Sequence, residues 1–134
     1  MGGQDGAAER WQIGEVATRT ELSIKTIRHY DDVGLVTPSV RSAGGFRLYT
    51  RRDVDRLIAI RRMKPLGFTL DEMRELLAAL DTLAAEDATA AARARAHTFI
   101  AVCRQRADEA CAELTRQLAY AQEFTAQLAQ YDES

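Results

Sequence analysis

Residues 23–34, SIKTIRHYDDVG, decide the fold of this chain. Ser23 can cap a helix here, because its hydroxyl can accept a hydrogen bond from a backbone N–H group of the first turn. Gly34 stands where a helix commonly ends in a left-handed residue, a conformation that glycine adopts without strain. Just before this stretch, residues 13–22, IGEVATRTEL, indicate a shorter helix and a tight turn. Two short helices joined by a tight turn predict a helix-turn-helix motif.

The second helix of this motif has an apolar side and a basic side. Ile24 and Ile27 share the apolar side, and the basic side chains point away from it. Arg28 is the strongest candidate for a nucleic-acid contact, because a guanidinium can bind a phosphate or the major-groove edge of guanine. Lys25 and Thr26 stand in the N-terminal part of the helix, which usually enters the major groove first. The candidate DNA contacts on this helix are Ser23, Lys25, Thr26, Arg28, His29 and Tyr30.

Residues 35–49, LVTPSVRSAGGFRLY, change to the pattern of a β-hairpin. Gly44 and Gly45 can supply the positive φ angles of its turn. Because side chains alternate along a strand, Phe46 and Leu48 share one face, and Arg47 and Tyr49 share the other. We expect Phe46 and Leu48 to pack against the domain. A basic, aromatic hairpin that follows a helix-turn-helix is typical of a wing. The candidate phosphate contacts on this wing are Arg41, Arg47 and Tyr49.

Two further helices follow the wing. Thr50 and Asp53 form an approximate capping box for the first, which Pro65 and Gly67 end. Thr69 and Glu72 form a T-x-x-E capping box for the second, and leucines and a methionine make its apolar stripe. Residues 81–90, DTLAAEDATA, indicate a weak linker after it.

From residue 91 to Ser134 neither Pro nor Gly occurs, which predicts one long helix. Apolar residues or Cys fill nine of ten a and d positions of a heptad repeat, and this pattern favours a coiled coil. A small domain cannot cover so long a seam, so we expect a second copy of the chain in a two-fold dimer. The predicted dimer seam contains Ile100, Cys103, Ala107, Ala110, Leu114, Gln117, Ala121, Phe124 and Leu128.

The composition fits one small domain plus an extension. Charged residues are 28% and apolar residues 46% of the 134 residues, which excludes disordered, collagen-like and membrane classes. No apolar run approaches the length of roughly 20 residues that a membrane span needs. Residues 1–10 have neither apolar periodicity nor the apolar core of a secretory signal, and we expect a disordered tail there and a cytoplasmic protein.

The charge is divided unevenly along the chain. Residues 11–65 carry 11 Lys and Arg against 6 Asp and Glu, whereas residues 66–134 carry 6 against 12. A basic half joined to an acidic half suggests that the basic half meets a polyanion. Two solvated faces that differ by chance would give the same numbers.

These segments together resemble the MerR family of bacterial transcription regulators. The motifs are IGEVA, SIKTIRHYDDVGLV, RSAGGFRLY and RRMKPLGFTLDEM, which follow in the family's order and cover residues 12–80. Pro65 departs from the pattern, because a helix-compatible residue is expected there. The resemblance implies an all-α fold with a small β-hairpin wing: a winged helix-turn-helix domain over 11–80, then a linker and dimerisation helix over 81–134 that forms an antiparallel coiled coil.

The resemblance also implies a function. Members of the family are homodimers that bind a pseudo-palindromic operator in a promoter with an overlong spacer, and bend and untwist it for RNA polymerase. It further implies that the Tyr30 hydroxyl binds a phosphate. From the residues alone, a half-buried core aromatic remains the alternative for Tyr30, and His29 is equally well a plain exposed side chain. A simple repressor without an inducer and a coiled-coil protein-interaction module remain as alternatives.

Neither an enzyme nor a cofactor is expected. The sequence has no P-loop, no G-x-G-x-x-G before a helix and no C-x-x-C, and neither histidine stands at metal-ligand spacing with a cysteine. Cys103 and Cys111 lie eight residues apart on one helix, about 12 Å of rise, too far to share a metal or form a disulfide. Across a two-fold axis Cys111 could approach its counterpart, or it is an inert thiol.

Overall fold

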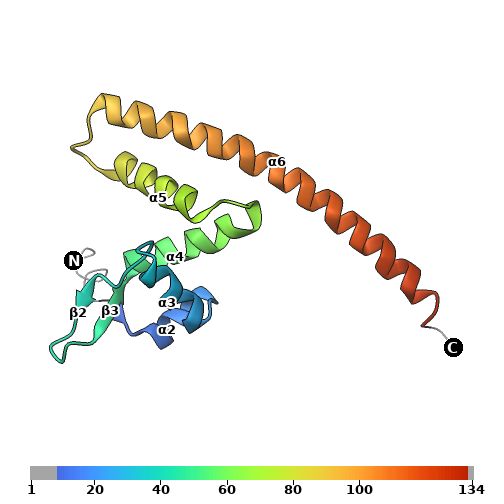
Figure 1. Ribbon diagram of the computed structural model, residues 1–134, viewed down its shortest axis with the longest axis horizontal. Helices are drawn as coiled ribbons and strands as arrows, with labels where there is room; N and C mark the ends of the chain where they lie inside the picture. Colours follow the sequence, from blue (N-terminus) through green and yellow to red (C-terminus); the bar gives the residue numbers. More distant parts are fainter. Residues whose placement is uncertain (1–8, 133–134) are drawn as a thin grey trace. The chain divides into compact units, whose positions relative to one another are not determined.

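The computed structural model describes residues 9–132, which form two units. The first extends to Ala78 and the second begins at Ala79, so helix α5 (Leu70–Ala84) crosses the boundary. The first unit holds strand β1 (Arg10–Trp11), helices α2 (Ile13–Thr20) and α3 (Ile24–Asp32), strands β2 (Val40–Arg41) and β3 (Arg47–Thr50), helix α4 (Arg51–Met63), the 3-10 turn η1 (Lys64–Leu66) and the start of α5. Figure 1 shows α2, α3 and the hairpin gathered beside α4. The mostly helical class with a small wing is confirmed.

The helix-turn-helix forms where the sequence predicts it. Ser23 caps α3, and its hydroxyl accepts from the backbone N–H of Thr26 at 3.0 Å. Gly34 has a φ of 71°, the left-handed conformation expected after the helix. The turn before α3 depends on Glu21, which adopts a φ of 58° although it is not glycine. Such a conformation is costly for an L-residue and has to be held by its surroundings.

A buried threonine holds this turn on α4. The Thr20 hydroxyl donates to the carbonyl of Val16 at 2.8 Å and accepts from the backbone N–H of Leu22 at 3.3 Å. Arg61 on α4 donates to the Thr20 carbonyl at 2.8 Å. The core beneath contains the fully buried side chains of Val16, Thr20, Ile27, Leu57 and Ile60. The buried face of α3 therefore packs inward and its other side stays exposed.

The wing belongs to a three-stranded sheet rather than to a hairpin alone. The strand order is β1-β3-β2, and both pairings are antiparallel. In β1, Arg10 pairs with Thr50 and Trp11 with Tyr49. Arg10 thus lies in a strand, one residue before the predicted start of the domain, and Glu9 is ion-paired with Arg51 at 2.9 Å, so the predicted disordered tail is wrong for these two residues. Residues 1–8 of that tail lie outside the described residues. The sequence does not predict β1, because a strand of two residues is too short to show a periodic pattern.

Both predicted capping boxes are present. The Thr50 hydroxyl accepts from the N–H of Asp53 at 3.2 Å, and the Asp53 carboxylate accepts from the N–H of Thr50 at 2.9 Å. Thr69 and Glu72 make the same reciprocal pair, at 2.9 and 3.1 Å. Between the two helices, Pro65 lies in η1, so α4 ends at Met63, and Gly67 follows with a φ of 83°. The departure at Pro65 shortens the helix instead of kinking it.

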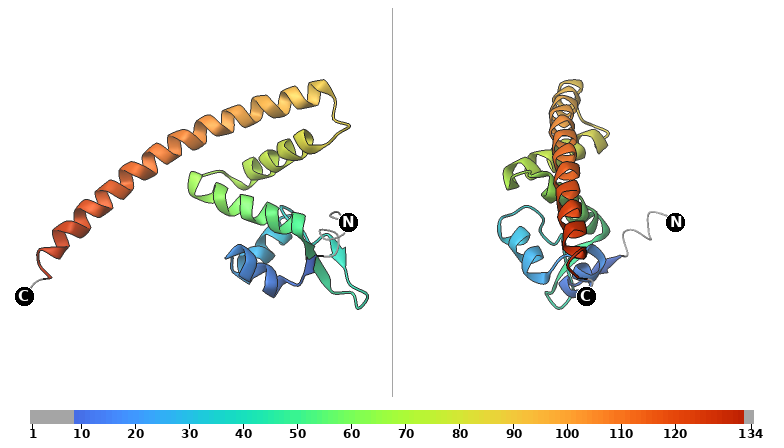
Figure 2. Two further views of the ribbon diagram at one scale, coloured as in Figure 1. Left: turned by 180° about the vertical axis from the view of Figure 1, so that it is seen from behind. Right: turned by 90° about the vertical axis from the view of Figure 1, so that its right-hand side faces the viewer.

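The second unit consists of the end of α5 and the long helix α6 (Ala90–Ala129, 40 residues). Thr89 caps α6 by accepting from the N–H of Ala92 at 3.1 Å. Because α5 continues to Ala84, the predicted linker over 81–90 is only five residues, 85–89. Figure 2 shows α6 in orange and red without a break. Within residues 9–132, no helix is long and apolar enough to cross a membrane.

Candidate DNA interface

The outer side of α3 carries cations that no neighbour neutralises. Lys25, Arg28 and His29 are exposed, whereas Ile27 and Tyr30 are buried. Within residues 9–132, Lys25 and Arg28 have neither an ion pair nor a side-chain hydrogen bond. An unpaired cation on a rigid helix is ready to bind an anion without first breaking an internal contact.

The polar side chains at the start of α3 are already paired with each other. The Ser23 hydroxyl donates to the Thr26 hydroxyl at 2.9 Å and accepts from the Thr26 backbone. Thr26 is half-buried. Ser23 therefore positions the helix, and the charge available at this end comes from Lys25.

Of the two arginines on the wing, Arg47 is in an ion pair and Arg41 is not, within residues 9–132. Arg41 is exposed, and within residues 9–132 its side chain donates only to the carbonyl of Gly45, at 3.4 Å. Arg47 makes an ion pair with Asp31 at the end of α3, with N–O distances of 2.9 and 3.0 Å. This ion pair joins β3 to α3, so it sets the wing against the helix and at the same time competes with any phosphate for Arg47.

Tyr49 in β3 and Phe46 just before it are buried and exposed, respectively, the reverse of what the sequence predicts. Tyr49 is 3% exposed, while Phe46 at the wing tip is 64% exposed. Tyr49 therefore contributes to the core more than to an outer surface, and Phe46 does not pack the wing against the domain. The expectation is wrong for these two residues, while Arg47 is exposed and Leu48 is half-buried. Alternation alone cannot decide which face points inward, because a strand rotated by half a turn has the same pattern.

Tyr30 is buried rather than exposed on the outer side of α3. It is 2% exposed, and its hydroxyl is buried without a hydrogen-bond partner within residues 9–132. Burial raises the pKa of this hydroxyl, which keeps it a proton donor at neutral pH. As placed, the hydroxyl is shielded from an approaching phosphate, so the core-aromatic alternative describes its position.

Lys64, an exposed cation in η1, is not among the candidates that the sequence predicts. Lys64 and Lys25 are the only lysines among the 18 Lys and Arg residues of the chain, and the scarcity of lysine was a signal that could have drawn attention to both. Within residues 9–132, no group of three or more His, Cys, Asp and Glu side chains could hold a metal ion.

The comparisons with known proteins decide the family. A family model described as "MerR HTH family regulatory protein" matches residues 11–80, and one described as "MerR, DNA binding" matches residues 54–131. The chain belongs to the MerR family. The MerR resemblance read from the sequence is therefore confirmed, and with it the class of DNA-binding, non-enzymatic transcription regulators.

Curated MerR-family relatives match over the N-terminal half. The regulator CueR of Yersinia pestis is 48% identical over 66 residues, which are 49% of this chain and 48% of that protein. The regulator ZntR of Escherichia coli K12 is 46% identical over 67 residues, 50% of this chain and 48% of that one. The nodulation protein NolA of Bradyrhizobium elkanii is 43% identical over 68 residues, which are 51% of this chain and 31% of that protein. The chain spans about half or less of the length of these relatives.

Solved structures match over nearly the whole chain. The regulator PbrR691 of Ralstonia metallidurans, solved in complex with lead(II), is 34% identical with a TM-score of 0.52, over 84% of this chain and 86% of that one. HiNmlR, a MerR family regulator lacking the sensor domain and bound to promoter DNA, is 19% identical with a TM-score of 0.69. The match covers 93% of this chain and 88% of that one. The second likeness shows the MerR-type fold alone.

Proposed function

We propose that this chain is a homodimeric, sequence-specific regulator that reads the major groove of a promoter with α3. The observation that carries the proposal is the pair of unpaired, exposed cations Lys25 and Arg28 on a capped helix. A helix fits the major groove, and Arg28 can contact a guanine edge there while Arg41 on the wing takes a phosphate. As a bacterial DNA-binding regulator it would act in the cytoplasm.

The dimer is proposed from the exposed apolar side chains of α6. From Cys111 to Asp132 every residue is exposed, and the large apolar ones include Leu114, Phe124 and Leu128 of the predicted seam. An apolar row of this length along one helix calls for a second helix to cover it. Cys103, by contrast, is already buried in the single chain. The proposed seam therefore relies on its C-terminal part, from Leu114 onward.

Dimerisation links two copies of α3 for two half-sites of one operator, which makes the second contact intramolecular and raises the affinity. By its MerR-type fold we propose that the dimer bends and untwists a promoter with an overlong spacer and acts on RNA polymerase there. Transcription in vitro from such a promoter separates this activity from simple repression, because a repressor lowers the transcript and never raises it.

The DNA contact is tested with the variant Arg28→Ala and a labelled operator selected from random duplexes. Losing a base contact costs about 1–3 kcal/mol and relaxes the preference at one base pair. Arg104→Ala is the matched control, because it removes the same charge from an exposed position on α6. Equal affinities for the two variants would refute the assignment of α3, and a wild-type chain with no salt-dependent DNA binding would favour the protein-interaction module.

The dimer is tested by sedimentation of the full chain with Leu114→Asp or Phe124→Asp. A charge in an apolar seam is unpaired on burial, so the variants should be monomeric where the wild type is dimeric. Gln122→Asp introduces the same charge one position from the seam residue Ala121 and should remain dimeric. A dimer that persists in both seam variants would place the interface elsewhere.

A further inference from the structure

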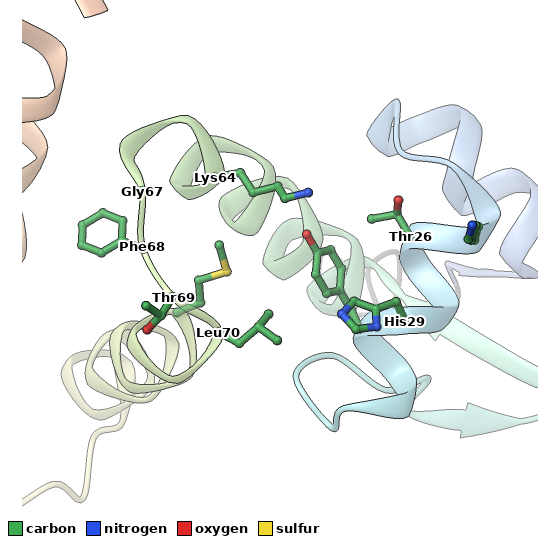
Figure 3. A pocket seen from close by; sticks show the side chains of 10 residues that line it. Thr26, His29, Lys64, Gly67, Phe68, Thr69 and Leu70 are labelled. Carbon is green, nitrogen blue, oxygen red and sulfur yellow. The ribbon is translucent and has the colours of Figure 1, made fainter. Parts of the chain in front are cut away.

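Two helices of the first unit, α3 and the start of α5, face each other across a cavity. Thr26, His29 and Tyr30 line it from α3. Leu70 and Met73 line it from α5. Figure 3 shows Thr26 and His29 on one side of this cavity and Leu70 on the other. Side chains therefore leave part of the space between the two helices unfilled, and contacts at the edge of the cavity gain importance for their relative position.

One such contact joins the side chain of Arg74 on α5 to the end of α3. The Arg74 Nη2 donates to the carbonyl of Val33 at 2.7 Å, and Nη1 lies 3.3 Å from a carboxylate oxygen of Asp71. Val33 is the C-cap residue of α3. The last carbonyls of a helix have no partner within the helix, and a cation near them also interacts favourably with the helix dipole. The contact therefore stabilises the C-terminal end of α3.

The contact with the main chain is the part that joins two elements. Asp71 is 90% exposed and stands three residues before Arg74 on the same helix, so this ion pair contributes little. Val33 and Arg74, in contrast, are 41 residues apart in the sequence. The planar guanidinium can serve both acceptors at once, whereas a lysine ammonium has no such fixed fork. Asp71 thus helps to orient Arg74, and the hydrogen bond to Val33 connects α5 with α3.

The other contacts around α3 are of the same kind. Arg61 on α4 donates to the carbonyl of Thr20, the last residue of α2, at 2.8 Å, and lies 3.6 Å from Glu21. Near the C-terminal end of α3, Arg47 on the wing pairs with Asp31. Helix α3 is therefore attached to α4 through the turn that precedes it, and to the wing and α5 at its end.

The direction of α3 decides which base edges its side chains can reach. Arg28 stands five residues before Val33, about 7.5 Å along the helix axis, so a tilt of the C-terminal end also displaces the Arg28 guanidinium. A bidentate contact with a base edge requires a defined geometry, whereas a contact with a phosphate depends mainly on charge. A loosely held α3 should therefore lose base contacts before it loses phosphate contacts.

We propose that Arg74 is a positioning residue for sequence recognition. By donating to the Val33 carbonyl, it fixes the direction of α3 and so determines how strongly the chain prefers its operator to other DNA. The proposal rests on the proposed function, in which α3 reads the major groove. Arg74 acts through α3 and makes no contact with DNA itself.

Amide hydrogen exchange of the full chain, followed by NMR, tests the hold on α3 without DNA. In Arg74→Ala, the N–H groups of Gly34 and Leu35, which close the C-terminal end of α3, should exchange about five-fold faster, because this end opens more often. The N–H of Ile27 in the first turn should exchange as in the wild type. Arg74→Lys keeps the charge and should lie between the wild type and Arg74→Ala.

Anisotropy titrations test the consequence, using the selected operator and a random-sequence duplex of equal length. Arg74→Ala should bind the operator about five-fold more weakly and the random duplex like the wild type, with an unchanged salt dependence. Arg74→Lys should recover part of the preference. Asp71→Asn keeps the contact with Val33, and Arg104→Ala removes an exposed arginine from α6, so both should keep the wild-type ratio of the two affinities.

The possible results separate the proposal from its alternatives. Arg74→Ala that weakens both duplexes equally and lowers the salt slope by about one unit would show a direct phosphate contact and overturn the proposal. Unchanged exchange at Gly34 and Leu35 would overturn the hold on α3, and an unchanged preference for the operator would overturn its role in recognition. A wild type that prefers no DNA sequence refutes the proposed function, and the exchange rates then decide by themselves whether Arg74 holds α3.

Discussion

Asp53 connects the base of the wing to α4. We expect its removal to lower the free energy of unfolding by more than the removal of an exposed charged side chain. The side chain is 5% exposed. One carboxylate oxygen accepts from the backbone N–H groups of Ser39 at 3.1 Å and Thr50 at 2.9 Å, and the other accepts from the Ser39 hydroxyl at 2.6 Å. In Asp53→Ala all three hydrogen bonds are lost, and two backbone N–H groups lose their acceptor.

The magnitude follows from these contacts. A hydrogen bond to a charged group contributes about 1.5–3 kcal/mol. Because the donors are only partly buried, water replaces part of what is lost, and we expect a loss of about 3 kcal/mol in the free energy of unfolding. With a urea m-value of about 2 kcal/mol per molar, the unfolding midpoint should fall by about 1.5 M. Ser39→Ala removes only the hydroxyl contact and should cost about 1 kcal/mol.

The assay is urea unfolding of the full chain at one protein concentration, followed by circular dichroism. Asp55→Ala is the control, because it removes the same charge from an exposed position on the same helix and should change stability by less than about 0.5 kcal/mol. An Asp53→Ala midpoint equal to that of Asp55→Ala would refute the role given to this carboxylate, and so would a Ser39→Ala loss as large as that of Asp53→Ala.

Three further predictions follow from single contacts. Glu21→Gly should raise the free energy of unfolding by about 0.5–1 kcal/mol in urea melts, because glycine adopts the observed left-handed φ without strain; a clear loss of stability would contradict this. Asp31→Asn frees Arg47 and removes a negative charge from the interface, so DNA affinity should rise about three-fold in anisotropy titrations, and an unchanged affinity would show that the ion pair does not compete with DNA. Exposed Cys111 should react with a thiol reagent well before buried Cys103, and Cys111→Ser should remove the fast phase; two equally fast thiols would contradict the burial of Cys103.

Much of the interface could be read from the sequence because its information is local. A cap such as Ser23 or Thr50 acts on N–H groups two or three residues away, and the period of α6 is set by neighbours along one helix. The exposed position of Arg28 follows from the burial of Ile27 beside it on the same short helix. These features can therefore be predicted without knowing which segments pack against one another in the folded protein.

Other features depend on contacts between segments that lie far apart in the sequence, and only the tertiary structure shows them. Strand β1 forms because Arg10 pairs with Thr50, which lies forty positions further along the chain. A strand of two residues has no sequence pattern that predicts this pairing. Whether Tyr49 or Phe46 faces inward depends on which side of the sheet meets the helices, and strand alternation is the same either way. The unpaired Tyr30 hydroxyl and the cavity beside it arise from how α3 packs near the α4–α5 turn, since contacts between distant segments determine which polar groups lose water.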